Sequence, residues 1–309
     1  MKVKQLAAVG LAALLACAPL QALELQGDTR AHDPTLLVEQ GRHHIFTTGA
    51  GIQRLSSADG KTWLRQAPVF SEANKPAWWA TVVPEHKGLD VWAPKLFKHA
   101  GRFWVMYSIS TFGKNVSAIG LASAESPEAR DWRDDGLVVA SGFEDNFNAI
   151  DPDVLIDNKD GRLWFSYGSF WGGIRLSELD RKTLKPIGET RFIARRKGGI
   201  EAPTLMQRGG WYYQFVSHDF CCRGVESSYN IRVGRAKNVW GPYLDKDGVA
   251  MTEGGGSLIE AGGPRWKGPG HQDVVGNTLV RHAYDAEDGG KPHLRIDPLR
   301  WSADGWPSL

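Results

Sequence analysis

The stretch Gly101–Arg102–Phe103–Trp104–Val105–Met106–Tyr107 decides the fold, because four related stretches recur along the chain. In each of them a glycine opens a short run rich in aromatic and aliphatic residues, which is typical of a strand that follows a tight turn. The other four begin at Gly41, Gly161, Gly210 and Gly276, and successive glycines are 60, 60, 49 and 66 residues apart. This spacing indicates a repeated structural unit.

Further short strands fill each unit. Runs bounded by Gly, Pro, Asn and Asp separate the glycines, Ala118–Ala122 and Ile231–Ala236 resemble third strands, and no long segment has helical periodicity. Four short strands in each of five units predict an all-β fold, a five-bladed β-propeller with a central cleft, rather than a β-sandwich without a regular period. The last unit departs from the others, since Asn277–Thr278–Leu279 stands where they carry aromatic residues.

The N-terminus has the pattern of a secretory signal. Lys2 and Lys4 precede the apolar stretch 6–20, and Gln21–Ala22 offers a cleavage point. We therefore expect a signal peptide at residues 1–22, a single propeller domain at 23–309, and a secreted or periplasmic protein. A second interpretation is a lipoprotein anchored at Cys17 on the outer surface. The apolar stretch is short for a membrane span, and no later segment could cross a bilayer.

Charge and cysteine content narrow the class of partner. Without Lys2 and Lys4, 35 of the 37 basic residues remain against 35 acidic ones, which argues against nucleic acid or anionic lipid. Thirteen Trp residues suit the apolar faces of sugars, although Trp is also a good core residue. The adjacent Cys221 and Cys222 cannot join distant segments, and the sequence leaves open whether they form a vicinal disulfide or two buried thiols.

A second repeated element stands seven to eleven residues before the glycine of each of the first four strands and five to six residues before Gly276. Blades closed around an axis would gather all five of these elements at one end of the central channel. They would bring together Asp33, Asp151, Glu201 and His271, with the three acids at equivalent positions of the repeat. The five elements are His32–Asp33–Pro34, Trp92–Ala93–Pro94, Ile150–Asp151–Pro152, Glu201–Ala202–Pro203 and Gly270–His271.

Converging carboxyl groups beside aromatic residues are what glycoside hydrolysis needs. One protonated carboxyl group protonates the leaving oxygen, and one carboxylate activates water on the opposite face of the sugar. Any single Asp-Pro is more often an ordinary turn dipeptide, but three acids in one repeat position favour function. Asp153 competes with Asp151, because it lies two residues away on the same face of a strand, and spacing alone does not separate them.

Nearly the whole chain after residue 22 resembles glycoside hydrolase family 43, and within it the endo-arabinanases that cleave α-1,5-linked L-arabinan. The matching motifs appear in the order of the family. Besides the elements at Asp33, Asp151, Glu201 and His271 they comprise Ser110–Gly120, Asn148–Ala149, Ser169–Gly173, Cys221–Gly224, Gly254–Ser257 and Gln272.

The resemblance implies hydrolysis with inversion and assigns roles to the acids. Asp33 corresponds to the general base and Glu201 to the general acid. Asp151 corresponds to the third carboxylate, which raises the pKa of the acid and orients it, so the resemblance selects Asp151 over Asp153. Inversion leaves room for water, and we expect the carboxyl groups of Asp33 and Glu201 to lie about 6.5–9.5 Å apart.

The resemblance also implies substrate and metal contacts. His271 corresponds to a histidine associated with one bound calcium ion, and since calcium prefers oxygen ligands, water would supply most of its shell. Gln272 and Asp273 could assist, but Asp273 lies outside the family pattern. Phe170 and Trp171 are also candidates for packing between blades, with sugar contact favoured for Trp171. The expected sugar-contacting residues are Asp33, Trp92, Phe112, Gly113, Asn148, Asp151, Ser169, Phe170 and Trp171.

Three functions remain open from the sequence. The leading one is internal cleavage of arabinan, with arabinan and arabino-oligosaccharides as the partners and a monomer as the default state. The second is an exo-acting arabinofuranosidase or β-xylosidase on the same propeller, which would share the three acids and differ in its loops. The third is a non-catalytic arabinan-binding propeller, which would have no need of a base, an acid and a third carboxylate.

Overall fold

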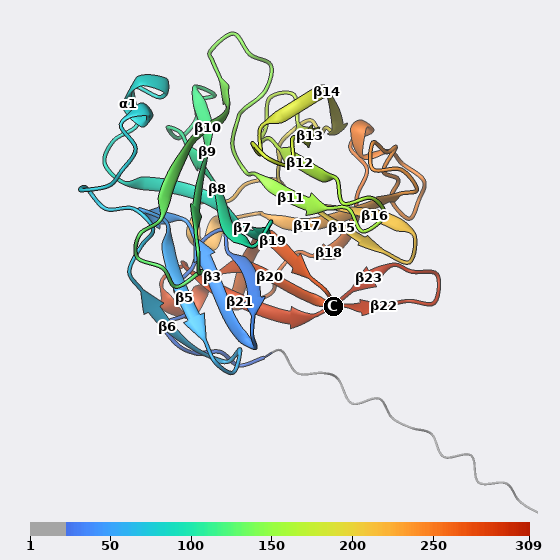
Figure 1. Ribbon diagram of the computed structural model, residues 1–309. Coiled ribbons are helices and arrows are strands. Elements are labelled where there is room, and N and C mark those ends of the chain that lie inside the picture. The colour runs from blue at the N-terminus through green and yellow to red at the C-terminus, as the bar shows by residue number, and fades with distance from the viewer. Residues whose placement is uncertain (1–22) are drawn as a thin grey trace, which may run out of the picture.

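The structure is a computed structural model that describes residues 23–309, and the expected signal peptide lies outside the described residues. Five sheets follow one another around a ring, in the order of the chain (Figure 1). The predicted all-β five-bladed β-propeller is therefore confirmed. No helix within residues 23–309 is long and apolar enough to cross a membrane.

Each blade is an antiparallel meander whose first strand is the innermost. Blade one contains β2 (Thr35–Glu39), β3 (Arg42–Thr47), β5 (Gln53–Ser57) and β6 (Thr62–Gln66). Blade two contains β7 (Asp90–His99), β8 (Arg102–Ile109), β9 (Ser117–Ala124) and β10 (Arg133–Ser141), with β4 (Gly49–Ala50) added beside β7. Blade three contains β11 (Asp153–Ile156), β12 (Leu163–Tyr167), β13 (Ile174–Leu179) and β14 (Pro186–Ala194).

The last two blades complete the ring. Blade four contains β15 (Ile200–Arg208), β16 (Trp211–His218), β17 (Asn230–Ala236) and β18 (Ser257–Glu260). Blade five contains β19 (Trp266–Val275), β20 (Thr278–Asp285) and β21 (Lys291–Pro298), followed by the hairpin of β22 (Arg300–Trp301) and β23 (Pro307–Ser308). The described helices are short: α1 (Trp78–Val82), η1 (Gly224–Glu226), η2 (Met251–Glu253) and η3 (Ala286–Asp288).

The repeated glycines turn the chain from the first strand of each blade to the second. All five have positive φ, from 62° at Gly276 to 79° at Gly41 and Gly101, a conformation that glycine adopts without steric cost. At Gly41, Gly101 and Gly210 the preceding residue also has positive φ. Two such residues in succession are typical of the type I′ turn, whose twist matches that of a β-hairpin.

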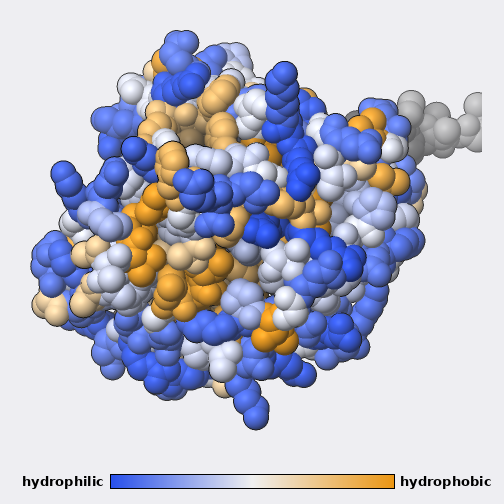
Figure 2. Space-filling view, turned by 90° about the horizontal axis from the view of Figure 1, so that it is seen from above, coloured by the Kyte–Doolittle hydropathy of each residue, from blue (hydrophilic) through white to orange (hydrophobic). Residues whose placement is uncertain are grey.

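Apolar residues fill the space between neighbouring blades. Five separate core clusters are present in residues 23–309, one at each interface between adjacent blades. Because a blade packs on both of its faces, its middle strands are almost wholly buried, as all of β9 is. The surface is mostly hydrophilic, with apolar residues gathered in part of the face that Figure 2 shows.

The ring closes through residues from both ends of the described chain. β1 (Gln26–Gly27) pairs in parallel with β6 at the edge of blade one, and Arg30 pairs with His293 of β21 in blade five. The backbone N–H of Leu294 donates to the carbonyl of Thr29 at 2.7 Å. The N-terminal segment thus supplies the outer edge of the last blade, which explains why blade five has only three strands of its own.

Candidate active site

The five inner strands begin with the same backbone feature. In each inner strand, or two residues before it, one residue that is not glycine has positive φ. L-residues keep this conformation only when their surroundings enforce it. These residues are Asp33, Ala93, Asp151, Ala202 and His271, with φ between 48° and 58°. Glu201 therefore stands one position earlier than Asp33 and Asp151 in the repeat, and the expectation of three equivalent acids was wrong in that detail.

The backbone N–H of each of these residues donates a hydrogen bond to a side chain of the preceding blade. The five acceptors are His282 Nδ1 for Asp33, Thr48 Oγ1 for Ala93, Ser108 Oγ for Asp151, Asp151 Oδ2 for Ala202 and Ser217 Oγ for His271, at 2.8–3.0 Å.

Blade three differs from the other blades at this contact. In blades two, four and five the acceptor lies on the second strand of the blade, paired with the residue just before the one that has positive φ. These acceptors are Ser108, Ser217 and His282. In blade three Gly168 takes that place, because its N–H donates to the carbonyl of Ile150, the residue before Asp151. As a glycine it has no side chain that could accept a hydrogen bond. Asp151 serves instead, so its carboxylate is tied to the residue that follows Glu201.

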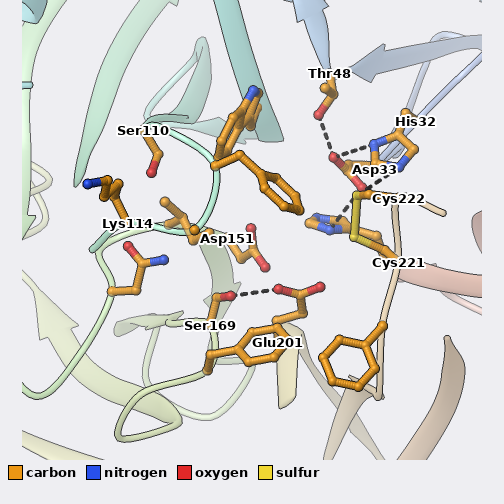
Figure 3. Close-up of a pocket in the computed structure, with 18 of the residues that line it drawn as sticks. His32, Asp33, Thr48, Ser110, Lys114, Asp151, Ser169, Glu201, Cys221 and Cys222 are labelled. Atoms are coloured by element: carbon orange, nitrogen blue, oxygen red, sulfur yellow. Dashed lines mark hydrogen bonds and ion pairs between the residues drawn. A yellow bond between two sulfur atoms is a disulfide. The ribbon is translucent and has the colours of Figure 1, made fainter. Parts of the chain in front are cut away.

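These strand starts surround a cavity of about 450 Å³. Side chains of Asp33, Asp151 and Glu201 converge in it from blades one, three and four (Figure 3). Its lining also contains aromatic side chains, of which Phe112 and Trp171 are exposed. An apolar cavity with a few converging polar groups is the usual form of a small-molecule site.

Asp33 is held as a carboxylate. Its Oδ2 accepts hydrogen bonds from Thr48 Oγ1 at 2.5 Å and from His32 Nδ1 at 2.9 Å, and its Oδ1 lies 3.2 Å from His271 Nδ1. Burial raises the pKa of Asp33, but His271, His32 and His282 outweigh burial, and the pKa ends far below its ordinary value. Asp33 is thus an ionised carboxylate in a buried site.

The pKa values of Asp151 and Glu201 are shifted in the opposite direction from that of Asp33. Burial, Glu201 and Asp33 raise the pKa of Asp151 well above its ordinary value. Burial also raises the pKa of Glu201, against the hydrogen bond that Ser169 Oγ donates to its Oε2 at 2.6 Å. Two buried carboxyl groups with raised pKa values hold a proton between them at a higher pH than exposed carboxyl groups do.

All of the expected sugar-contacting residues line this cavity. Asn148 is buried and its Oδ1 has no hydrogen-bond partner within the described residues, so it is free to receive a hydroxyl group. Phe170 packs near Phe220, with ring centroids 5.8 Å apart, while Trp171 is 48% exposed and does not pack between blades. The full set is Asp33, Trp92, Phe112, Gly113, Asn148, Asp151, Ser169, Phe170 and Trp171.

The sequence reasoning missed several lining residues. Thr48 and His32 contact Asp33, and Tyr229 lies against the buried side of the cavity. A Cβ at Gly270 would meet the Tyr229 ring at 2.0 Å, so Gly270 is needed for this close approach. The loop 220–223 forms one wall, and its Cys221 and Cys222 are joined by a disulfide. The Cys221–Gly224 motif was the one signal that could have placed this loop at the site.

Gln272 and Asp273 face away from this cavity. Gln272 accepts a hydrogen bond from Ser217 Oγ and donates to the carbonyl of Ala202. Asp273 lies 2.8 Å from Lys95 Nζ, and the same ammonium group lies 2.7 Å from Asp153. Neither Gln272 nor Asp273 is available to an ion beside His271, and Asp153 belongs to this deeper ion cluster rather than to the cavity.

A buried pair of carboxyl groups that shares a proton, opposite a carboxylate that stays ionised, provides the acid and the base of glycoside hydrolysis. Fold and site together define a glycoside hydrolase. Residues 27–307 match the sequence model of the glycosyl hydrolases family 43, and the chain belongs to this family.

Known proteins of similar sequence and structure include arabinanases and an arabinofuranosidase, as their names state. The chain is 48% identical to the extracellular endo-α-(1→5)-L-arabinanase 1 of Bacillus subtilis, over 90% of this chain and 87% of that protein. It is 39% identical to the extracellular exo-α-(1→5)-L-arabinofuranosidase ArbA of Cellvibrio japonicus, over 96% and 90% of the two chains. The solved endo-arabinanase of Bacillus licheniformis superposes with a TM-score of 0.89 at 47% identity, over 93% and 99%.

Proposed function

We propose that this protein is an inverting endo-1,5-α-L-arabinanase that cleaves internal bonds of arabinan and arabino-oligosaccharides. The observation that carries the proposal is the division of the three acids within one cavity: the pKa of Asp33 is lowered by the histidines around it, whereas burial raises the pKa values of Asp151 and Glu201. A non-catalytic sugar-binding propeller would have no use for this division. The 48% identity to a Bacillus subtilis protein named as an endo-arabinanase supports the choice of substrate.

The residues divide the reaction among them as follows. Glu201, held by Ser169, donates its proton to the leaving glycosidic oxygen. Asp33 Oδ2 accepts from both Thr48 and His32, whereas Oδ1 has only His271 Nδ1 beside it at 3.2 Å, so Oδ1 is the oxygen with a lone pair left for the proton of the attacking water. Asp151 repels negative charge on Glu201 and, through the N–H of Ala202, fixes the backbone beside it.

Inversion is a further part of the proposal. It requires a separation of about 6.5–9.5 Å between the carboxyl groups of Asp33 and Glu201, with water between base and sugar. Proton NMR of the first turnover on an arabino-oligosaccharide tests it. The new reducing end should appear with the opposite anomeric configuration, and retention of configuration would exclude Asp33 as a base that acts on water.

Internal cleavage is favoured by space beyond the main cavity. A second hollow of about 420 Å³ lies on the other side of Trp171, which lines both, and gives room for further sugar residues. The exo-acting enzyme is the alternative, since a relative with 39% identity bears that name. Incubation with debranched arabinan separates the two: an early ladder of oligomers supports endo cleavage, and arabinose or one short product alone would overturn it.

A calcium ion beside His271 completes the proposed site. His271 Nδ1 faces Asp33, and none of the hydrogen bonds within residues 23–309 uses its other ring nitrogen. Within residues 23–309, Asp33 is the carboxylate that contacts the His271 ring, so the residues fit an ion that water coordinates almost entirely. When bound, such an ion would supply positive charge at the floor of the site. Calcium should raise the melting temperature of the wild type and leave that of His271→Ala unchanged.

Export and assembly are further parts of the proposal. Two relatives are named extracellular, and we propose that this protein too is exported, either as a soluble secreted or periplasmic protein or anchored at Cys17. A monomer is kept as the default state of assembly. Mass spectrometry of the mature N-terminus distinguishes cleavage after Ala22 from lipid attachment at Cys17.

A further inference from the structure

The disulfide between Cys221 and Cys222 lies on the wall of the cavity, in the loop between β16 and η1 (Figure 3). Adjacent cysteines close a very small ring, so this bond constrains little of the unfolded chain. Its effect is local instead: it holds the short turn at Cys222, where φ is 65°. A conformation of this kind in a non-glycine residue persists only where the surroundings enforce it.

The turn connects to the proposed base through two side chains. The backbone N–H of Cys222 donates to the hydroxyl of Tyr284 at 2.7 Å. This hydroxyl lies 2.9 Å from His32 Nε2, and His32 Nδ1 lies 2.9 Å from Asp33 Oδ2. The chain of contacts thus runs from blade four, through β20 of blade five, to the start of blade one.

The direction of these hydrogen bonds places a proton on the correct nitrogen of His32. The Tyr284 oxygen accepts from Cys222 and donates its own hydrogen to Nε2 of a neutral His32. The ring hydrogen is then on Nδ1, where it is donated to Asp33. If His32 is charged, Nδ1 still carries a proton and the bond to Asp33 is kept.

Packing fixes the plane of the His32 ring. It stacks on His282, with centroids 4.0 Å apart and 24° between the planes. Cys222 Sγ lies 3.9 Å from His32 Nε2, so the disulfide also borders the ring edge. His282 itself accepts the N–H of Asp33, and Tyr284 packs against its edge at 5.2 Å. Tyr284 lies behind His32 and is not among the described residues that line the cavity.

We infer that Tyr284 and His32 are positioning residues for Asp33, and that the Cys221–Cys222 turn holds them in place. The inference rests on the proposed role of Asp33 as base. With Oδ2 bonded to Thr48 and to an oriented His32, Asp33 turns Oδ1 toward the site of the attacking water. Reduction of the disulfide loosens the turn, and the His32 ring then loses its orientation beside Asp33.

Tyr284→Phe tests the first link, because it removes one oxygen and keeps the ring. The kcat on debranched arabinan should fall about tenfold, the size expected for one lost hydrogen bond to a buried polar group, with KM unchanged. Tyr243→Phe is the matched control: Tyr243 is buried and donates to the carbonyl of Val239 at 2.7 Å, away from the cavity. It should lower the melting temperature and leave kcat as it is. A Tyr284→Phe enzyme with wild-type kcat would overturn the inference.

Reduction by a dithiol tests the second link. Two electrons and two protons pass from dithiothreitol to the protein, the S–S bond breaks into two thiols, and the reagent closes to its cyclic disulfide. With reduction verified by a mass increase of about 2 Da, kcat of the wild type should fall, while Tyr284→Phe should lose little more. Equal losses in both would show that the disulfide acts on activity by another route.

A readout without substrate separates this inference from the proposed function. Long-range proton–nitrogen NMR of the histidines reports which nitrogen of His32 carries the proton. The wild type should show a proton on Nδ1, and Tyr284→Phe should show a mixture of the two tautomers. If the wild type fails to cleave arabinan but the tautomer shifts as expected, the substrate assignment fails and the link to Asp33 stands. An unchanged His32 signal in Tyr284→Phe would overturn the link whatever the activity.

Discussion

Two layers of charged side chains lie on the same inner strands, and their difference shows what makes a carboxyl group reactive. The cavity layer contains Asp151 on the approach to β11, and the deeper layer contains Asp153 two residues further along. Both side chains are buried. In the deeper layer, Lys95 lies 2.7 Å from Asp153 and 2.8 Å from Asp273, so a cation compensates the acids.

The cavity layer lacks such a cation at the corresponding place. Ala93 stands two residues before Lys95, on the same strand, and contributes no charge. Asp151 and Glu201 therefore face burial and each other, and their pKa values rise, whereas Asp33 is surrounded by imidazoles and its pKa falls. Both layers contain buried acids. In the deeper layer Lys95 opposes the effect of burial, so that the pKa of Asp273 is lowered while that of Asp153 stays raised, whereas no cation opposes burial at Asp151.

The largest effect should come from removing the proposed acid. Glu201→Gln keeps the size of the side chain and the contact with Ser169, but it has no acidic proton to donate. Release of reducing ends from linear arabinan should fall by about 10²–10⁴-fold, with an unchanged melting temperature. Asp153→Asn, in the deeper layer, should retain the wild-type kcat per folded molecule. A Glu201→Gln enzyme within a few-fold of the wild type would remove Glu201 from the acid role.

The deeper layer should respond in stability rather than in chemistry. Lys95→Met leaves Asp153 and Asp273 buried without their cation, and we expect a loss of about 3–5 kcal/mol in the free energy of unfolding, measured by urea denaturation. Lys98→Met is the matched control on the same strand. Lys98 pairs with Glu39 at 2.7 Å on the surface, where such a pair contributes about 0–1 kcal/mol. Equal losses in the two variants would contradict the distinction between the layers.

The smallest effect should be a shift of the pH profile. Glu201 must be protonated to act, so kcat falls as pH rises through its raised pKa. Glu201 is one of the groups that raise the pKa of Asp151, and because the repulsion between two ionised groups acts on both of them, Asp151→Asn removes it from Glu201 as well. The pKa of Glu201 then drops, and the alkaline limb of the kcat profile moves to lower pH. A limb that stays in place would indicate that Asp151 positions the backbone of blade four without affecting the proton of Glu201.

Much of the fold could be predicted because it rests on local rules. A glycine with positive φ turns each hairpin, and the strand that follows it is rich in aromatic and aliphatic residues and mostly buried. Blade five was the least predictable, since its outer edge comes from residues near the other end of the chain, where Arg30 pairs with His293. Pairing over such a distance leaves no periodic signal in the sequence.

The acids of the site could be predicted from the sequence, but the residues that orient them could not. The acids could be located because the repeat marks the start of each inner strand. Thr48 and Tyr284, by contrast, are not part of any sequence motif that would predict their contacts with Asp33 and His32. The offset of Glu201 by one residue was also hidden, because only the backbone conformation at Ala202 reveals which position is equivalent.

The sequence by itself determined the repeat, the propeller, the family resemblance and the acids that stand at the strand starts, because these follow from turn chemistry, strand periodicity and spacing. Tertiary structure alone decided which acids keep a proton, which are neutralised by Lys95, and how Cys222 reaches Asp33 through Tyr284 and His32. The physical reason is that charge compensation and burial depend on distances in space, and those distances join residues of different blades.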